Sequence, residues 1–368
     1  MTFGARYESR MIRQWAGRPR TSRRGRGRPV VAATAALVVL GTACGGGGGR
    51  ATGSSSTTAP PPSSTSTSTT VTTTTAPRGP GASAWTGPSA VAPGRALVAL
   101  SCPTPSFCMA LDDMGAAYAY NGSAWSAGQT LAAGSVSGDK AFVSCISAAF
   151  CVSVPVGSQA NAWNGSAWGP GVTVGGTEKL QALSCAGPRF CIAIDQVGNG
   201  YAYDGTTWTH TATAFGSPSA VSCTSPTFCL AVEESNVTFW NGTAWSQPTD
   251  EDAHGEFLSV SCTSPAFCVT GDTEGAVLAW NGHSWSAAQT IDPASSITAT
   301  GNLLVGLSCV GATFCVAVDT AGDVLTFQQG AWSAPAAVGA TSAMTAVSCV
   351  SSAFCMAVDA AGNAYAMH

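Results

Sequence analysis

The strongest constraint on this chain is a segment that recurs seven times between Ser101 and Cys355: Ser-Cys, four residues, Phe-Cys. A period of about 40 residues is typical of repeat architectures in which each copy is one supersecondary unit. The seven copies begin at Ser101, Ser144, Ser184, Ser222, Ser261, Ser308 and Ser348. We therefore expect an array of similar units that bury their faces against one another.

Each copy predicts four short strands. Its apolar and β-branched residues come in short runs that are too short for helices and are bounded by turn residues. The run after the second Cys ends in an acidic residue in six copies: Asp112, Asp195, Glu233, Asp272, Asp319 and Asp359. In most copies Gly follows three residues later, as in a type I turn. The next run closes on Asn-Gly or Asp-Gly, a strong hairpin signal, and a fourth strand begins near Trp.

Four antiparallel strands in about 40 residues make one blade of a β-propeller. The seven fourth-strand tryptophans are Trp85, Trp125, Trp168, Trp208, Trp245, Trp285 and Trp332. Trp85 precedes the first cysteine pair, whereas the last repeat ends without a fourth strand. The sequence therefore predicts an all-β fold over residues 83–368: a seven-bladed β-propeller of four-stranded antiparallel blades. An N-terminal strand around Trp85 would close the ring and remove an open sheet edge.

Fourteen of the fifteen cysteines form pairs six residues apart. Opposed positions at the neck of a hairpin are close enough for a disulfide, which predicts one disulfide per blade, each contributing roughly 2–2.5 kcal/mol. The predicted disulfides join Cys102 with Cys108, Cys145 with Cys151, Cys185 with Cys191, Cys223 with Cys229, Cys262 with Cys268, Cys309 with Cys315 and Cys349 with Cys355. The alternative, metal binding, needs four ligands per site, and the four histidines recur at no fixed offset. We expect no metal and no cofactor, and seven disulfides require an oxidising compartment.

The remaining cysteine, Cys44, follows nine arginines in the first 28 residues and an apolar stretch from Pro29 to Leu40. That stretch is too short to span a bilayer and is typical of a signal peptide. The segment Leu-Gly-Thr-Ala-Cys-Gly from Leu40 resembles the lipobox of bacterial lipoproteins. The resemblance implies cleavage before Cys44 and lipid on that residue; the alternative is ordinary cleavage that leaves a free thiol.

These features divide the chain into a lipoprotein-type signal peptide (1–43), a linker rich in Gly, Ser, Thr and Pro (44–82) and the propeller (83–368). The linker composition is that of a flexible tether without a core. From the lipobox to its end, the chain resembles secreted bacterial seven-bladed propeller lipoproteins. This resemblance implies an extracytoplasmic protein held on the outer face of the bacterial cell membrane by lipid on Cys44.

From Cys44 onward there are 6 basic and 18 acidic residues, a net charge of −12. No basic stripe is present to meet phosphate, so nucleic acid is not an expected partner. The same balance argues against direct binding of anionic lipid, which leaves the lipid anchor as the expected membrane contact.

Length variation is confined to the connections between blades. From the first Cys to the Trp of a repeat the spacing is 22 or 23 residues, whereas from Trp to the next first Cys it ranges from 15 to 24. Variable loops on a rigid scaffold are where binding residues concentrate. The candidate binding-rim residues lie in one acidic connection: Asp250, Glu251, Asp252, His254 and Glu256. Their spacing lacks the order of a calcium loop, so a solvated acidic loop is favoured over a metal site.

Aromatic residues precede the Asn-Gly or Asp-Gly turn in five copies: Tyr120, Trp163, Tyr203, Trp240 and Trp280. They fit either a sugar-stacking platform or packing between neighbouring blades, and packing is favoured because blade faces must be buried. The turn is similar to the Asp-box of sialoside-hydrolysing propellers, but its polar residue is one place off that pattern. Only Arg95 and Arg189 fall in the propeller, so the arginine trio of such enzymes cannot be assembled.

Histidine is scarce and no pairing of a nucleophile with a base is evident, so we expect no catalytic residues. The favoured function is a non-enzymatic binding or scaffold module for a protein partner at the cell envelope. The alternative is a lectin-like propeller that binds glycan, and a glycan-cleaving enzyme is the least favoured. Fold alone does not decide among these.

Overall fold

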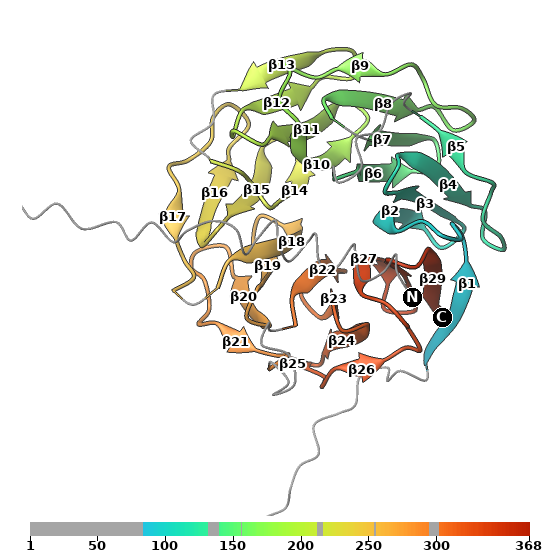
Figure 1. Ribbon diagram of the computed structural model, residues 1–368. Coiled ribbons are helices and arrows are strands. Elements are labelled where there is room, and N and C mark those ends of the chain that lie inside the picture. The colour runs from blue at the N-terminus through green and yellow to red at the C-terminus, as the bar shows by residue number, and fades with distance from the viewer. Residues whose placement is uncertain (1–83, 132–139, 156, 212–215, 254, 294–301) are drawn as a thin grey trace, which may run out of the picture. The chain divides into compact units, whose positions relative to one another are not determined.

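The computed structural model describes residues 84–131, 140–155, 157–211, 216–253, 255–293 and 302–368. These residues form seven antiparallel sheets arranged as blades around a ring (Figure 1). The predicted all-β, seven-bladed propeller is therefore confirmed. Within the described ranges, no helix is long and apolar enough to span a membrane.

The blades follow one another in chain order, and each runs from an inner strand outward. Blade 1 comprises β2 (Leu97–Thr104), β3 (Phe107–Asp112), β4 (Ala116–Tyr120) and β5 (Gln129–Thr130). Blade 2 comprises β6 (Phe142–Ser147), β7 (Phe150–Val154), β8 (Gln159–Trp163) and β9 (Val172–Thr173). Blade 3 comprises β10 (Leu180–Gly187), β11 (Phe190–Asp195), β12 (Gly200–Tyr203) and β13 (Trp208–Thr211). Blade 4 comprises β14 (Ala220–Ser225), β15 (Phe228–Glu233), β16 (Asn236–Trp240) and β17 (Thr249–Asp250).

The last three blades repeat the same order, with two departures. Blade 5 comprises β18 (Phe257–Ser264), β19 (Phe267–Asp272), β20 (Ala276–Trp280) and β21 (Gln289–Thr290). Blade 6 comprises β22 (Leu304–Cys309), β23 (Phe314–Asp319), β24 (Asp323–Gln328) and β25 (Ala331–Trp332), and β26 (Ala336–Ala337) also pairs with β24. Blade 7 comprises β27 (Met344–Ser351), β28 (Phe354–Asp359), β29 (Asn363–Met367) and β1 (Trp85–Ala90).

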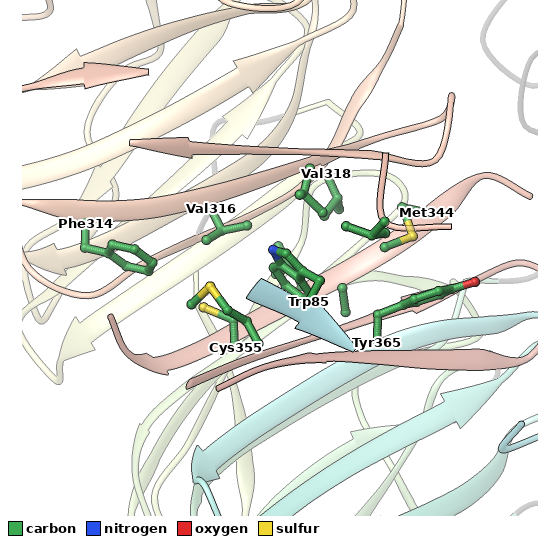
Figure 2. Packing of buried hydrophobic residues seen from close by; sticks show 12 residues of the cluster. Trp85, Phe314, Val316, Val318, Met344, Cys355 and Tyr365 are labelled. Atoms are coloured by element: carbon green, nitrogen blue, oxygen red, sulfur yellow. The ribbon is translucent and has the colours of Figure 1, made fainter. Parts of the chain in front are cut away.

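The ring is closed as the sequence predicts, because β1 from the start of the propeller pairs antiparallel with β29 from its end. Trp85 lies opposite Met367 and is buried among residues of blades 6 and 7. Figure 2 shows its indole ring between Val316 and Val318 of β23 on one side and Tyr365 of β29 on the other. Closure therefore joins both ends of the propeller in one hydrophobic cluster and leaves the outer edge of blade 7 paired.

Each blade contains one cysteine pair at disulfide distance, with S–S separations of 2.02–2.05 Å. The pair joins the first two strands close to the short hairpin that the Ser-Cys and Phe-Cys motifs flank. The bonds are those predicted: Cys102 with Cys108, Cys145 with Cys151, Cys185 with Cys191, Cys223 with Cys229, Cys262 with Cys268, Cys309 with Cys315 and Cys349 with Cys355.

The two cysteines of a pair differ in burial. The second, on the second strand, has no exposed surface in any blade: Cys108, Cys151, Cys191, Cys229, Cys268, Cys315 and Cys355. The first, on the inner strand, keeps some exposure. The role of these fourteen residues is therefore structural: each pair ties the first two strands of its blade together. Each covalent link joins the first two strands of its blade and stabilises the fold by restricting the unfolded chain.

The motif serine joins neighbouring blades around the centre. Its Oγ accepts a hydrogen bond of 2.9–3.0 Å from the backbone N–H of the motif's first Cys in the next blade, at all seven interfaces. The series closes at the last interface, where Ser348 of blade 7 accepts from Cys102 of blade 1. We call this series the Ser ring. The recurrent serine is thus explained by inter-blade hydrogen bonding, in agreement with its predicted structural role.

Candidate functional site

The connections between blades lie beside the turns that join the second and third strands. At the turn of blade 4, Glu234 O accepts the backbone N–H of Phe257 at 2.7 Å, and Ser235 O accepts that of Glu251 at 3.0 Å. In blade 5, Thr273 N donates to Glu256 O at 3.0 Å. The connection from blade 4 to blade 5 is therefore held between two turns, which places acidic residues from three segments on one rim.

The exposed acidic side chains of this region are Glu234, Asp250, Glu256 and Glu274, and that of Glu251 is half-exposed. We call these five residues the acidic rim. Three of them, Asp250, Glu251 and Glu256, are candidate residues from the sequence, whereas Glu234 and Glu274 enter from the adjoining turns. His254, a further candidate, lies outside the described residues, as does the predicted lipidation site Cys44.

Asp252 is placed differently from its neighbours. The sequence groups it with the exposed acidic connection, but only 4% of its surface is exposed. Its carboxyl turns into the interface between blades 4 and 5, where it meets Asp272 at the end of β19. Asp252 therefore differs from the exposed candidates of this connection, and we describe it with the buried carboxyl groups below.

The acidic residue at the end of the second strand has the predicted turn role. In blades 1, 3 and 7 its Oδ1 accepts two backbone N–H groups of the following turn, those two and four residues further on. The Oδ2 atom accepts the hydroxyl of a tyrosine on the third strand at 2.9–3.2 Å. The three pairs are Asp112 with Tyr118, Asp195 with Tyr201 and Asp359 with Tyr365. We call these the Tyr–Asp blades.

Burial and the adjacent carboxylate act together on these tyrosines. They raise the pKa of Tyr118 to about 12, and they also raise the pKa of Tyr201 and of Tyr365. A phenol with a raised pKa keeps its proton and remains a hydrogen-bond donor at neutral pH. Each carboxylate in a Tyr–Asp blade is therefore matched to donors on both of its oxygens.

Blades 5 and 6 replace the tyrosine with leucine, Leu278 and Leu325. In the described part of the chain, no N–H or O–H donor reaches the buried Oδ2 of Asp272 or Asp319. Each meets a second carboxyl instead, from the connection that enters its own blade: Asp252 meets Asp272, and Asp292 meets Asp319. We call these the Asp–Asp blades.

Burial is the main cause that raises the pKa of both acids in the Asp–Asp blades. Desolvation, with the contribution of Asp252, raises the pKa of Asp272 to about 6. For Asp319, desolvation and the hydrogen bond with Asp292 raise the pKa to about 8. All four side chains are almost fully buried, and burying two like charges together is disfavoured.

The residue seven positions after each outer tryptophan distinguishes the two kinds of blade. Before the Tyr–Asp blades it is small: Ala92, Gly175 and Gly339. Before the Asp–Asp blades it is Asp252 or Asp292. At Gly175, an added Cβ would overlap the ring of Tyr201, so tyrosine and a side chain at this position compete for the same space. Asp292 is a site residue that the sequence reasoning missed, and this pattern is the signal that identifies it.

Blades 2 and 4 belong to neither kind. Blade 2 has Pro155 where the others have an acid, and its second strand ends at the preceding residue, Val154. In blade 4 the Oε2 of Glu233 accepts the backbone N–H of Gly216 at 2.7 Å from the entering connection. These blades join turn and connection without a buried carboxyl pair.

The recurring aromatic residues pack against the blades. Each of the five residues before the hairpin turn contacts the tryptophan of its own blade, with ring centroids 5.1–5.6 Å apart. These pairs adjoin the hydrophobic clusters between blades. In three blades the indole N–H also donates to a backbone carbonyl of the neck hairpin, from Trp163, Trp240 and Trp280. The favoured packing role therefore accounts for their position, and no separate sugar platform is needed to explain it.

No group of three or more metal-ligating side chains is present in the described part of the chain. The acidic connection contributes separate exposed carboxylates, and the buried carboxyls occur singly beside tyrosine or in pairs. A pair supplies fewer oxygen ligands than the six to eight that calcium requires.

Comparisons with known proteins give a likeness of fold. No protein-family model matches the sequence, and no curated protein matches it. The chain is similar to a solved structure described as YCF48 bound to D1 peptide, with 16% identity, 77% of this chain and 96% of that chain covered, and a TM-score of 0.61. It is also similar to U3-55K (12%, 76% and 99%, TM-score 0.65) and to the WD40 β-propeller domain of Doa1 (10%, 77% and 96%, TM-score 0.61). At these identities the likeness shows the fold alone.

Proposed function

We propose that this protein is a lipid-anchored, extracytoplasmic propeller that binds a protein partner through its acidic rim, without catalysis. The observation that carries the proposal is the gathering of exposed carboxylates from two turns and one connection: Glu234, Asp250, Glu256 and Glu274. Backbone hydrogen bonds hold these three segments together. A rigid acidic surface of this kind is complementary to a Lys- and Arg-rich segment of a partner.

The structural neighbours are compatible with this proposal, since YCF48 was solved with a bound peptide. Placement outside the cell rests on the seven disulfides, which persist in oxidising compartments, and on the lipobox-like segment before Cys44. The anchor is tested by Cys44→Ser. The variant should leave the membrane fraction of its bacterial host, and continued sedimentation with membranes would contradict the anchor.

Partner binding is tested with synthetic peptides rich in Lys and Arg, added to the purified full chain and followed by fluorescence anisotropy. We expect saturable binding that weakens with salt, because surface charge pairs are screened. Asp250→Asn combined with Glu251→Gln and Glu256→Gln should abolish it. The matched control is Asp204→Asn. Asp204 is exposed in the turn between β12 and β13, and the other hairpin turns already use asparagine at this position.

Equal peptide binding by the rim variant and the wild type would contradict the proposed rim. The lectin alternative has its own result in a parallel experiment, in which the chain is sedimented with protein-free cell-wall glycan. Saturable co-sedimentation that a soluble sugar competes away, together with no peptide binding, would replace the protein-binding proposal with a lectin.

A further inference from the structure

The Asp292–Asp319 pair is buried next to a further acidic residue. The charged groups that act most on Asp319 are both carboxyls, Asp292 and Asp323. The side chains of Asp292 and Asp319 are almost fully buried. Two ionised carboxylates in contact inside a protein, without a cation, are strongly disfavoured.

In the Asp292–Asp319 pair, nearby donors already form hydrogen bonds with the Oδ1 atom of each carboxyl. Asp319 Oδ1 accepts the N–H of Asp323 at 2.8 Å, and Asp292 Oδ1 accepts the side-chain amide of Asn302 at 3.2 Å. This leaves the two buried Oδ2 atoms, which no N–H or O–H donor reaches within the described residues. An ionised carboxylate accepts hydrogen bonds but does not donate. A hydrogen bond between the two carboxyls therefore requires a proton on one of them.

The pair at the next interface is built in the same way. Asp272 Oδ1 accepts the N–H groups of Glu274 and Ala276 at 2.9 and 2.7 Å. Its Oδ2 faces Asp252, whose backbone N–H is tied to Ser235 O of blade 4 at 3.3 Å. The Asp292 N–H is tied to Gly275 O of blade 5 at 3.0 Å. In both pairs, one carboxyl comes from a connection fixed to one blade and the other from the second strand of the next blade.

We propose that the Asp292–Asp319 pair shares one proton and acts as a proton-dependent latch between adjacent blades, at the blade 5–6 interface. With the proton, the pair forms a hydrogen bond across the interface. Without it, the interface holds two negative charges that repel each other.

The direction of the pH effect follows from the raised carboxyl pKa values. The folded protein holds a proton that the unfolded chain, with an ordinary carboxyl pKa near 4, releases. This contribution to stability is therefore complete below about pH 4 and is lost as the pH rises through the pKa of the pair. The Asp292–Asp319 latch therefore weakens as the pH rises through about 8.

The test compares urea unfolding midpoints of the full chain with those of Asp319→Asn, from about pH 5 to about pH 9. The asparagine amide donates to Asp292 at every pH, while its Oδ1 still accepts from Asp323. We expect equal midpoints at the acidic end and a higher midpoint for the variant at the alkaline end. Asp292→Asn should give the same profile, because either partner can supply the donor. Asp204→Asn should follow the wild type throughout.

A difference between variant and wild type that does not change with pH would overturn the proposal, as would a variant that is less stable throughout. A cation in place of the proton is tested by titrating the wild type with calcium chloride in a calorimeter. Saturable binding of calcium that Asp319→Asn abolishes would overturn the shared proton. Absence of calcium binding together with the pH-dependent difference would support the latch.

Discussion

The Tyr–Asp blades and the Asp–Asp blades solve the same structural problem in opposite ways. Both end their second strand in an aspartate whose Oδ1 holds the following turn. In blade 7 the buried Oδ2 of Asp359 meets the hydroxyl of Tyr365, a donor that keeps its proton. In blade 6 the Oδ2 of Asp319 meets Asp292, a group that ordinarily has none to give. In blade 7 the hydrogen bond to the aspartate does not change around neutral pH, because the tyrosine keeps its proton. In blade 6 the hydrogen bond between the two carboxyls requires a proton on one of them.

The two kinds of blade differ in the size of their side chains as well as in charge. In blade 3 tyrosine fills the gap between the third strand and the entering connection, where a Cβ at Gly175 would overlap the ring of Tyr201. The corresponding residues before the other two Tyr–Asp blades, Ala92 and Gly339, are also small. Leucine in place of the tyrosine is shorter and has no polar end, which leaves room for a side chain from the connection. An aspartate there brings a polar group into an interface that already contains one. A repeat protein can therefore vary the chemistry of one interface while its blade geometry is kept.

The largest difference is expected when the aspartate is removed altogether. Asp359→Ala leaves two backbone N–H groups, the Asn363 amide and the Tyr365 hydroxyl without their acceptor. We expect a loss of more than about 3 kcal/mol in unfolding free energy. Asp319→Ala leaves only the backbone N–H of Asp323 without its acceptor, and it removes the repulsion between Asp319 and Asp292. We therefore expect the unfolding free energy to fall by less than about 1 kcal/mol at alkaline pH. Chemical denaturation of both variants measures the difference, and equal losses would break the comparison.

The change in unfolding free energy should have opposite signs in the two blades when the aspartate becomes asparagine. Asp359→Asn brings an amide N–H₂ towards the donors of Tyr365 and Asn363, which costs about 1–3 kcal/mol. Asp319→Asn introduces the donor that its partner lacks, and stabilises the protein above about pH 8. Unfolding measured on both variants in one alkaline buffer gives the two signs directly. Destabilisation by both substitutions would show that blade 6 uses its carboxyl as blade 7 does.

The comparison is sharpened by converting one kind of blade into the other. Asp292→Gly with Leu325→Tyr gives blade 6 the residues that blade 3 has at Gly175 and Tyr201. We expect the new tyrosine to donate to Asp319 and the double variant to lose the stability change of the wild type near pH 8. The single variant Leu325→Tyr serves as the control, since its ring must share space with Asp292. If the double variant keeps the wild-type pH profile, Asp292 is not the partner that raises the Asp319 pKa.

The smallest effect is expected from Tyr118→Phe, which removes one hydroxyl and keeps the ring. Asp112 Oδ2 then loses its 3.0 Å hydrogen bond, while Oδ1 keeps the N–H groups of Met114 and Ala116. We expect about 1–2 kcal/mol of destabilisation, with no change in its pH dependence around neutrality. A change in the neutral pH profile would mean that Tyr–Asp pairs also exchange protons in this range.

Most of the fold follows from the sequence because its signals are local and repeated. The Ser-Cys and Phe-Cys motifs, the Asp turn and the Asn-Gly hairpin each lie within a few residues, and seven copies remove the ambiguity of any one. Ring closure through Trp85 was predictable because the tryptophan and cysteine series are out of phase. Packing of the aromatic residues was predictable because aromatics are the largest groups available to fill blade interfaces.

The carboxyl pairs escaped the same reasoning because they depend on which side chains meet across an interface. Asp252 stands among Asp250, Glu251 and Glu256, and nothing in that local composition distinguishes it from an exposed residue. The residue that accompanies it is Leu278 in the next blade, at the position where the Tyr–Asp blades have tyrosine. Asp292 is the only acidic residue in the sequence of its connection, so no cluster of acidic residues marks it as a candidate. Aligning the repeats on their outer tryptophans brings both acids to one position, opposite leucine in both cases.

The proton itself is the central claim, and ¹³C NMR of labelled aspartate carboxyls measures it most directly. In the full chain at about pH 7 we expect one buried carboxyl, that of the Asp292–Asp319 pair, to show the chemical shift of a protonated acid. The signal should titrate near pH 8, disappear in Asp319→Asn and persist in Asp195→Asn. If every aspartate is ionised at neutral pH in the folded wild type, the latch does not exist.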